Sequence, residues 1–330
     1  MAQTPPLSTE TLVLDAEVEV QRISAFLRTN LRTQLHRQGL VLGISGGIDS
    51  SVSAALAAKA LGAERVFGIF MPENDNDPLS LELGQKLASH FGIKAEIENL
   101  GPSLEAMGCY ARRDDAIRKL VPEYGPGWRN KVVINQSTEQ QAIGFSTLVV
   151  QSPSGEIQRV RMPADVYRTV VAATNMKQRL RKQVEYFHAD RLNFAVIGTP
   201  NRLEYDQGFF VKNGDGAADI KPIAHLYKSQ VYQLARHLGV PAEICQRLPT
   251  TDTYSLAQTQ EEFYFALPYQ KMDLCLYGLN HGLSAEAVAI AAELTPAQVE
   301  LAWQGIQAKR RTTRYLHLAP LLVEPVAEIH

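Results

Sequence analysis

The most constraining feature of the sequence is a glycine-rich hexapeptide, Ser45-Gly46-Gly47-Ile48-Asp49-Ser50, between an apolar run and a helical one. The apolar residues 40–44 predict a buried strand, and the alanine-rich residues 51–57 predict a helix. Gly46 and Gly47 have no Cβ, so phosphate oxygens can approach the backbone closely. The start of the helix offers free N–H groups and the positive end of its dipole, and Ser45 and Ser50 add hydroxyl donors. The hexapeptide therefore predicts a phosphate-binding loop.

The aspartate of this loop indicates a metal ion. Asp49 would repel a bound phosphate unless a divalent cation such as Mg²⁺ lies between them. The loop lacks the lysine and the length of the Walker pattern G-x-x-x-x-G-K-[ST]. The pattern S-G-G-x-D-S after a strand instead resembles the signature of the ATP pyrophosphatases, which cut ATP between the α and β phosphates. A glycine-rich turn without a ligand is the alternative, and the order strand, loop, helix disfavours it.

Composition narrows the class of protein. The 330 residues are 45% hydrophobic and 21% charged, as in a typical globular protein, and a net charge of −2 argues against a general nucleic-acid binder. No apolar run is long enough for a transmembrane helix, and no signal peptide is evident, so we expect neither a membrane nor a nucleic acid as a partner. The three cysteines, Cys109, Cys245 and Cys275, are widely separated and form no C-x-x-C pair, which favours a reducing, cytoplasmic location.

The periodicity of the first hundred residues predicts an α/β fold. Residues 65–71 and 93–98 read as two further strands, a helix over 79–91 lies between them, and another helix covers 14–36. Strands that alternate with helices indicate a doubly wound parallel sheet flanked by helices. Ligands bind such sheets at the carboxyl ends of the strands, where the hexapeptide lies.

The middle of the chain departs from this alternation. Residues 131–135 are a candidate strand, and residues 145–150 and 157–162 flank the turn-forming Ser152-Pro153-Ser154-Gly155, which predicts a β-hairpin. A core strand over 193–198 and an amphipathic helix over 226–238 follow. We expect a single domain, 1–330, in which 109–165 is an insertion and 270–330 a helical C-terminal extension.

A second group of motifs names a family. The chain continues with Gly198-Thr199-Pro200-Asn201-Arg202-Leu203-Glu204, then Lys212 and Asp215 within a glycine-rich run, and then Lys228 and Thr250; Asn175 and Arg179 precede them. Together with the phosphate loop, this order resembles the ammonia-dependent NAD synthetases. The resemblance covers roughly residues 15–105 and 172–255. It implies a fold of the adenine nucleotide alpha hydrolase type and a homodimer with its active sites at the subunit interface.

The resemblance implies a two-step reaction. The carboxylate of nicotinic acid adenine dinucleotide attacks the α-phosphate of ATP and releases pyrophosphate, and ammonia then displaces AMP to leave an amide. No side-chain nucleophile is needed, because the substrate carboxylate attacks. ATP is a substrate, and Mg²⁺ is the implied metal. No glutaminase module is evident, so ammonia would be used directly or supplied by a separate partner.

The resemblance also implies a role for each site residue. Asp49 and Glu204 would hold Mg²⁺, and Asp49, Lys228 and Thr199 would be catalytic. ATP and pyrophosphate would contact Ser45, Gly46, Gly47, Ser50, Thr199, Lys228 and Thr250. The acid substrate would contact Asn175, Arg179, Lys212 and Asp215. Each residue type also has an ordinary structural interpretation: a solvated helix residue for Glu204, a surface lysine for Lys228, a turn former for Asp215, a helix cap for Asn175 and a charged helix face for Arg179.

Three departures from the family pattern leave the acid substrate open. Gln178 stands where the family has alanine, and Lys182 where it has methionine. The segment 109–165 is longer than a minimal synthetase needs, and 249–269 differs from the usual acidic, glycine-containing loop. One alternative is therefore the same chemistry on another carboxylate, such as a mononucleotide. A second is a nucleotide-binding regulator without catalysis. Residues 283–311 also resemble a helix-turn-helix with a basic cluster, but the family ends in a similar helical hairpin.

Overall fold

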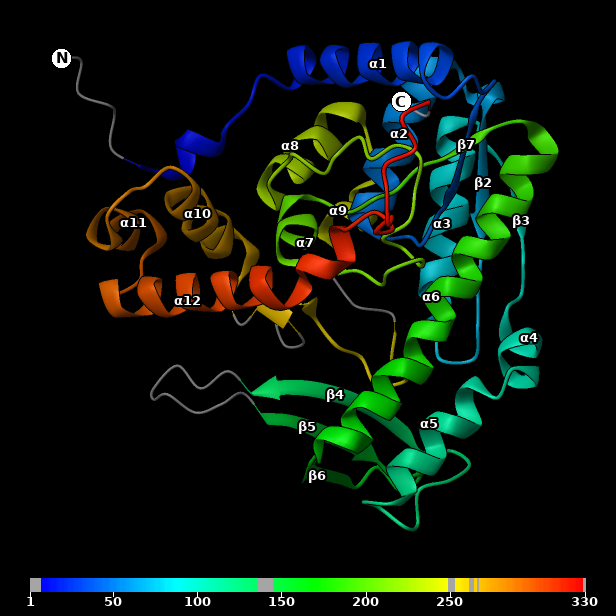
Figure 1. The fold of residues 1–330 in the computed structure, drawn as a ribbon, viewed down its shortest axis with the longest axis vertical. Helices are drawn as coiled ribbons and strands as arrows, with labels where there is room; N and C mark the ends of the chain where they lie inside the picture. Colours follow the sequence, from blue (N-terminus) through cyan, green and yellow to red (C-terminus); the bar gives the residue numbers. More distant parts are fainter. Residues whose placement is uncertain (1–6, 136–144, 249–252, 261–263, 266, 329–330) are drawn as a thin grey trace.

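The core of the protein is a four-stranded parallel sheet, seen in a computed structural model that describes residues 7–135, 145–248, 253–260, 264–265 and 267–328 (Figure 1). The strand order is β3-β2-β1-β7. Its members are β1 (Leu40–Gly43), β2 (Val66–Phe70), β3 (Lys94–Ile97) and β7 (Ala195–Val196). In the register, Leu40 pairs with both Val66 and Ala195.

The strand order makes the edge beside β1 the expected place for a ligand site. The chain moves from β1 through β2 to β3 on one side, and only later adds β7 on the other side of β1. In an open parallel sheet the crevice at such a reversal is the usual ligand site, because the two connections leave in opposite directions. The loops that follow β1 and β7 both begin at this crevice.

Side chains alternate between the two faces of the sheet, as strand geometry requires. Leu40 and Leu42 point into a core shared with α1 (Ala16–Thr33), α2 (Ile48–Leu61), α3 (Pro78–Phe91) and α8 (Lys228–Leu238). Val41 and Val196 point to the other face, where Ala189 of the long helix α6 (Ala164–Leu192) covers them. Helices therefore flank both faces, and the predicted doubly wound α/β fold is confirmed.

Local signals set the helix ends close to where the sequence places them. Asp77 caps α3 by accepting a hydrogen bond from the N–H of Leu79, and Gly92 ends this helix in the left-handed conformation at φ 66°. Gly239 ends α8 in the same way, at φ 75°. The first helix is shorter than the predicted 14–36, because Asp15 caps it at its start.

A second, antiparallel sheet lies at the bottom of Figure 1, formed by β4 (Arg129–Asn135), β5 (Phe145–Gln151) and β6 (Ile157–Arg161). Gln151 pairs with Ile157, so the predicted hairpin is confirmed, and β4 adds a third strand. Two helices precede this sheet, α4 (Gly101–Ala106) and α5 (Cys109–Arg118). The sheet packs on the start of α6, where Leu148 lies in one buried cluster with Val166 and Val170.

The C-terminal part is helical, as predicted. The remaining helices are α7 (Arg202–Gln207), α9 (Ala242–Gln246), α10 (Tyr269–Asn280), α11 (Ala285–Ala292) and α12 (Pro296–Thr313), with short 3-10 turns at Thr9–Leu12, Ala63–Arg65 and Arg314–His317. Leu276 and Ile306 are buried between α10 and α12. Among the described residues, every helix is too short or too polar to cross a lipid bilayer.

Candidate active site

The phosphate loop connects β1 to α2 in a conformation that only glycine allows. Gly46 has φ +73°, and a Cβ on it would lie 2.4 Å from the carbonyl oxygen of Ser80 in α3. Gly47 is the residue before α2. The hydroxyl of Ser50 donates to the Gly47 carbonyl (3.0 Å) and lies 3.0 Å from the hydroxyl of Ser45. The loop is therefore internally ordered, with Ser45 exposed at its surface.

Asp49 joins three distant segments at the crevice. Its Oδ1 accepts a hydrogen bond from the side-chain amide of Asn201, in the loop after β7, at 2.9 Å. Its Oδ2 forms an ion pair with Nζ of Lys228, at the start of α8. Lys228 is buried, with 1% of its surface exposed, so its interpretation as a surface lysine is wrong.

Glu204 belongs to the same group through Asn201. The N–H of Asn201 donates to Glu204 Oε2 (3.1 Å), and the N–H of Glu204 donates to Asn201 Oδ1 (3.3 Å), which is a capping box at the start of α7. Gln260 donates to Glu204 Oε1 at 2.9 Å. Glu204 is buried, so its interpretation as a solvated helix residue is wrong.

The charges of this group perturb one another. Burial raises the pKa of Glu204 and the nearby charge of Asp49 raises it further, to about 8. Burial alone would lower the pKa of Lys228, but Asp49 and Glu204 outweigh it and hold this pKa above its ordinary value. Two neighbouring carboxylates offer hard oxygen ligands, and a bound divalent cation would offset their negative charge. The oxygen atoms of Asp49 and Glu204 thus fit Mg²⁺. In this structure the two carboxylates bond instead to Lys228, Asn201 and Gln260.

The four residues predicted to face the acid substrate lie around α6 and the loop 211–216. Arg179 donates to the carbonyl of Lys212 at 3.2 Å, and Asn175 lies one turn earlier in α6, inside the helix rather than at a cap. Asp215 accepts from the N–H of Val211 (2.7 Å), and burial raises its pKa. Lys212 donates to the carbonyl of Leu318 at 3.1 Å. These contacts join Arg179 to Lys212, and Asp215 lies in the same loop as Lys212.

Two threonines, Thr199 and Thr250, are also predicted to contact ATP. Thr199 lies half-buried in the turn after β7, two residues before Asn201. Thr250 lies outside the described residues. Both roles stay predictions.

The comparison with known proteins decides the family. The NAD synthase family model matches residues 19–123 and 131–313. The chain belongs to the NAD synthase family. The NH(3)-dependent NAD(+) synthetase of Rhizobium meliloti (strain 1021) is 66% identical over 322 residues, which are 98% of this chain and 96% of that protein. The relative of the same name from Mesorhizobium japonicum is 56% identical, covering 96% and 99% of the two chains. The resemblance predicted from the motifs is confirmed.

Solved structures show the same fold at low sequence identity. The NMN synthetase from Francisella tularensis has a TM-score of 0.65 at 22% identity and covers 94% of this chain and 99% of its own. The NH3-dependent NAD synthetase from Campylobacter jejuni has a TM-score of 0.61 at 20% identity, with coverage of 94% and 100%. These likenesses establish the NAD synthase fold for the described chain.

Sequence reasoning missed three residues of this NAD synthase site. Asn201 bridges both carboxylates, and the spacing N-x-x-E, a capping-box signal, could have identified it. Gln260 contacts Glu204, and Asp273 of α10 contacts the start of α8. Neither Gln260 nor Asp273 has a local signal, because each acts on a residue more than 40 positions away.

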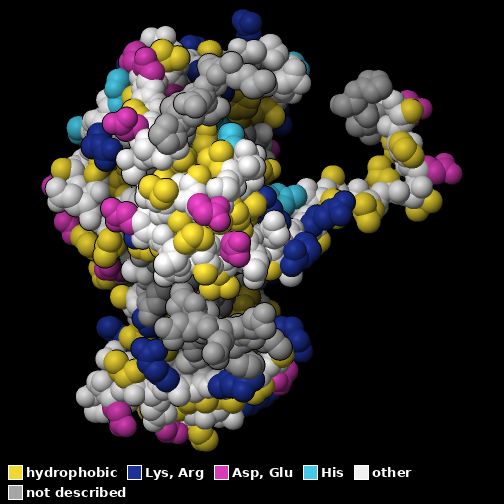
Figure 2. All heavy atoms as spheres, turned by 90° about the vertical axis from the view of Figure 1, so that its left-hand side faces the viewer, with side chains coloured by type: hydrophobic (Ala, Val, Ile, Leu, Met, Phe, Trp, Pro, Cys, Tyr) yellow, Lys and Arg dark blue, Asp and Glu magenta, His cyan; other side chains and the backbone are white. Residues whose placement is uncertain are grey.

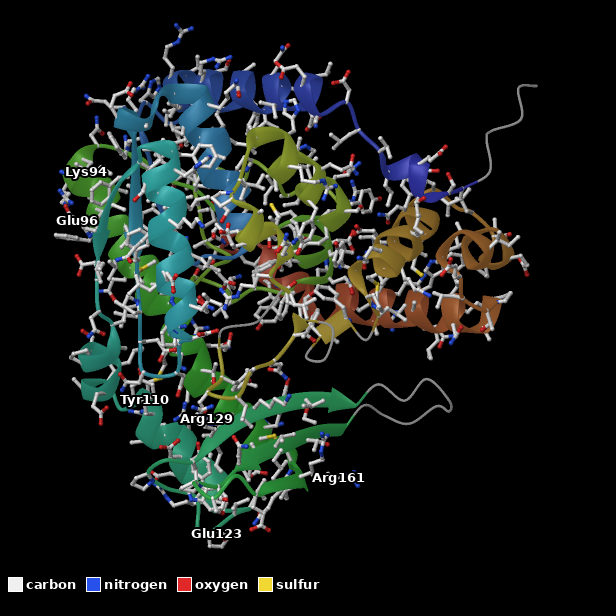
Figure 3. All side chains as sticks on the ribbon, turned by 180° about the vertical axis from the view of Figure 1, so that it is seen from behind. Lys94, Glu96, Tyr110, Glu123, Arg129 and Arg161 are labelled. Atoms are coloured by element: carbon white, nitrogen blue, oxygen red, sulfur yellow. The ribbon has the colours of Figure 1, made fainter. Side chains whose placement is uncertain are left out.

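His188 of α6 forms a separate cluster with two carboxylates, Glu96 on the edge strand β3 and Glu98 just after it, where Figure 3 labels Glu96. His188 lies 3.1 Å from Glu98. Arg191 donates to His188 Nδ1 (3.0 Å) and to Glu96 (3.3 Å). A guanidinium already neutralises this cluster, so we interpret it as an ion-pair network and not as a metal site.

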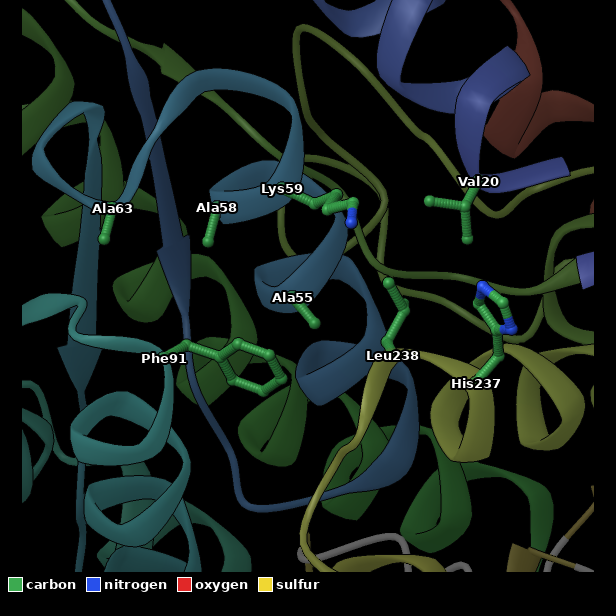
Figure 4. A pocket seen from close by; sticks show the side chains of 8 residues that line it. All are labelled: Val20, Ala55, Ala58, Lys59, Ala63, Phe91, His237 and Leu238. Carbon is green, nitrogen blue, oxygen red and sulfur yellow. The ribbon is translucent and has the colours of Figure 1, made fainter. Parts of the chain in front are cut away.

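A pocket of about 300 Å³ lies at the opposite end of α2 from the phosphate loop (Figure 4). Its walls come from α1, α2, α3 and α8 and are mostly apolar, with Lys59 and His237 as the polar members. The cavity beside Asn201 and Lys228 is far smaller, about 10 Å³, and Gln260 and Phe265 cover it. Proximity to the carboxylates, and not cavity size, therefore locates the candidate active site.

Proposed function

We propose that this chain is an ammonia-dependent NAD synthetase, which adenylates the carboxylate of nicotinic acid adenine dinucleotide with ATP and then amidates it. The observation that carries the proposal is one network beside a phosphate loop, in which Asn201 bonds to Asp49 and Glu204 and Lys228 pairs with Asp49. Family membership and the names of the close relatives agree with it.

The residues suit phosphoryl transfer, which depends on positioning and on neutralising charge. The substrate carboxylate attacks the α-phosphate, and the bond to the pyrophosphate leaving group breaks. Ser45, Gly46, Gly47 and Ser50 would bind that pyrophosphate at the start of α2. Lys228 and Thr199 would contact the α-phosphate region, and Thr250 would contribute a hydroxyl.

Asp49 and Glu204 would hold Mg²⁺. When bound, the ion would offset the negative charge of the phosphates and of the two carboxylates. The raised pKa of Glu204 supports this assignment, because a carboxylate that is costly to ionise alone is stabilised by a cation.

Asn175, Arg179, Lys212 and Asp215 would bind the acid substrate. Arg179 and Lys212 supply positive charge for a dinucleotide, and their contact across α6 and the loop 211–216 supports a shared role. In this proposal the chain is one domain, 1–330. Residues 109–165 are an insertion in it, and residues 270–330 are a helical C-terminal extension.

We further propose a homodimer. Residues 318–328 leave the body as an arm, which Figure 2 shows projecting from one side. Leu321, Leu322 and Val323 are 87%, 65% and 104% exposed, an unusual run of large apolar side chains in contact with solvent. A second copy would bury them. A cytoplasmic location fits the three cysteines, which are free.

A substrate comparison tests the function. Purified protein with ATP, Mg²⁺ and ammonium is given either nicotinic acid adenine dinucleotide or the corresponding mononucleotide acid, and pyrophosphate release is followed. We expect the dinucleotide to be the better substrate by kcat/KM. Preference for the mononucleotide would mean that the enzyme carries out the same reaction on a different acid. ATP binding without pyrophosphate release for either acid would favour a nucleotide-binding regulator without catalysis.

A further inference from the structure

Asp273 is a buried carboxylate on α10 that contacts the start of another helix. Its Oδ2 accepts a hydrogen bond from the N–H of Ser229 at 2.7 Å, and its Oδ1 accepts one from the N–H of Lys228 at 3.2 Å. These are the first two residues of α8. The first N–H groups of a helix have no partner within the helix, and here a carboxylate 45 positions away supplies both acceptors.

This cap fixes the backbone of a residue whose side chain belongs to the candidate active site. Lys228 is held at its N–H by Asp273 and at its Nζ by Asp49. Both Lys228 and Asp273 are buried, with 1% and 0% of their surfaces exposed. The position of the ammonium group relative to Asp49 therefore depends on where α10 places its carboxylate.

The helix that carries Asp273 is itself fixed in place. Tyr269 of α10 stacks on Tyr232 of α8 with ring centroids 5.1 Å apart. On the other side of α10, Nε1 of Trp303 donates to the carbonyl of Cys275 at 2.7 Å, which joins α12 to α10. The C-terminal helices thus form a support behind the start of α8.

We propose that Asp273 is a positioning residue for adenylation, which acts through Lys228 and couples the C-terminal helices to the ATP site. This inference rests on the proposed function, because it assigns Lys228 to the phosphates. Burial raises the pKa of Asp273 to about 7, so the ionised carboxylate is less favourable in the folded chain than in the unfolded one.

A double-mutant cycle tests the coupling. Asp273→Asn keeps the size of the side chain but leaves one N–H of α8 without an acceptor, and Lys228→Met removes the ammonium. Because an unsatisfied buried donor shifts the local structure at a considerable free-energy cost, we expect Asp273→Asn to slow pyrophosphate release about tenfold and to weaken ATP binding. In the Lys228→Met background the same substitution should change either quantity by less than about twofold.

Gln270→Ala is the matched control, because Gln270 is an exposed residue of α10 and its substitution leaves Asp273 and Lys228 untouched. It should keep the ATP affinity at a temperature where circular dichroism shows all variants folded. Equal effects of Asp273→Asn in both backgrounds, or an equal loss from Gln270→Ala, would overturn the proposal. ATP affinity, measured by calorimetry, does not depend on the acid substrate, so a wrong acid in the proposed function leaves this cycle decisive.

Discussion

Lys228 and Asp49 form a partly buried ion pair although 179 positions of the chain separate them. The pair exists because α2 and α8 both begin at the crevice beside β1, where the strand order reverses. The first turn of each helix faces this crevice. Asn201 then links the pair to Glu204. The site is an assembly of helix starts, and the free N–H groups of a helix start favour a bound anion.

Asn201→Asp should separate the structural role of this residue from its role toward Asp49. Aspartate still caps α7, so circular dichroism should show the fold retained, although a third carboxylate at this buried position should lower the thermal midpoint. The substitution replaces an amide donor by a third carboxylate beside Asp49 and Glu204, and we expect at least about a tenfold loss of pyrophosphate release. Asn30→Ala, on the exposed face of α1, is the control. Full activity in Asn201→Asp would contradict the bridging role.

Gly46→Ala should destabilise the protein by more than the backbone strain alone. The added Cβ would meet the Ser80 carbonyl at 2.4 Å in a left-handed conformation. Gly282 has a similar φ, +65°, and open space around it, so Gly282→Ala should cost only about 1 kcal/mol. Urea unfolding compares the two variants. A smaller loss for Gly46→Ala than for Gly282→Ala would show that the phosphate loop moves freely away from α3.

Stability should depend on pH through Lys309. Burial lowers its pKa to about 8, below the ordinary value of 10.5, so between these values the unfolded chain binds more protons than the folded one. The contribution of this lysine to the free energy of unfolding should therefore rise as the pH increases from 8 to 10. Urea unfolding of the wild type and Lys309→Met at pH 7 and pH 10 measures it. From pH 7 to pH 10 the free energy of unfolding of the wild type should increase relative to that of the variant. The same difference between the two proteins at both pH values would disprove the lowered pKa of Lys309.

The C-terminal arm should determine the oligomeric state. Replacing Leu321, Leu322 and Val323 with glutamate puts charges where we expect contact with a second copy. Sedimentation velocity should then show a larger monomer fraction, with unchanged circular dichroism. Glutamate in place of Ile290, an exposed residue of α11, serves as the comparison. An unaltered dimer in the arm variant would place the interface elsewhere, and a monomeric wild type would reject the homodimer.

The sequence predicted the features that depend on neighbouring residues better than those that depend on contacts between distant segments. The glycine-rich loop after β1, the end of the helix over 79–91 and the hairpin around Gly155 follow from short stretches of sequence, because each depends on neighbouring residues. Burial of Lys228 was not predictable, since its helix is amphipathic and the covering residues come from α2 and α10. The role of Asp273 was not predictable for the same reason, because its partners lie 45 and 44 positions earlier in the chain.

The central claim is tested most directly by following both products of one reaction. Wild-type protein is incubated with ATP, Mg²⁺, ammonium and nicotinic acid adenine dinucleotide, and NAD and AMP are measured together, with Asp49→Asn as the inactive control. The account predicts equal amounts of NAD and AMP from the wild type and neither from the variant, whose fold should be intact. AMP without NAD, no NAD at all from protein that binds ATP, or pyrophosphate release by Asp49→Asn would contradict it.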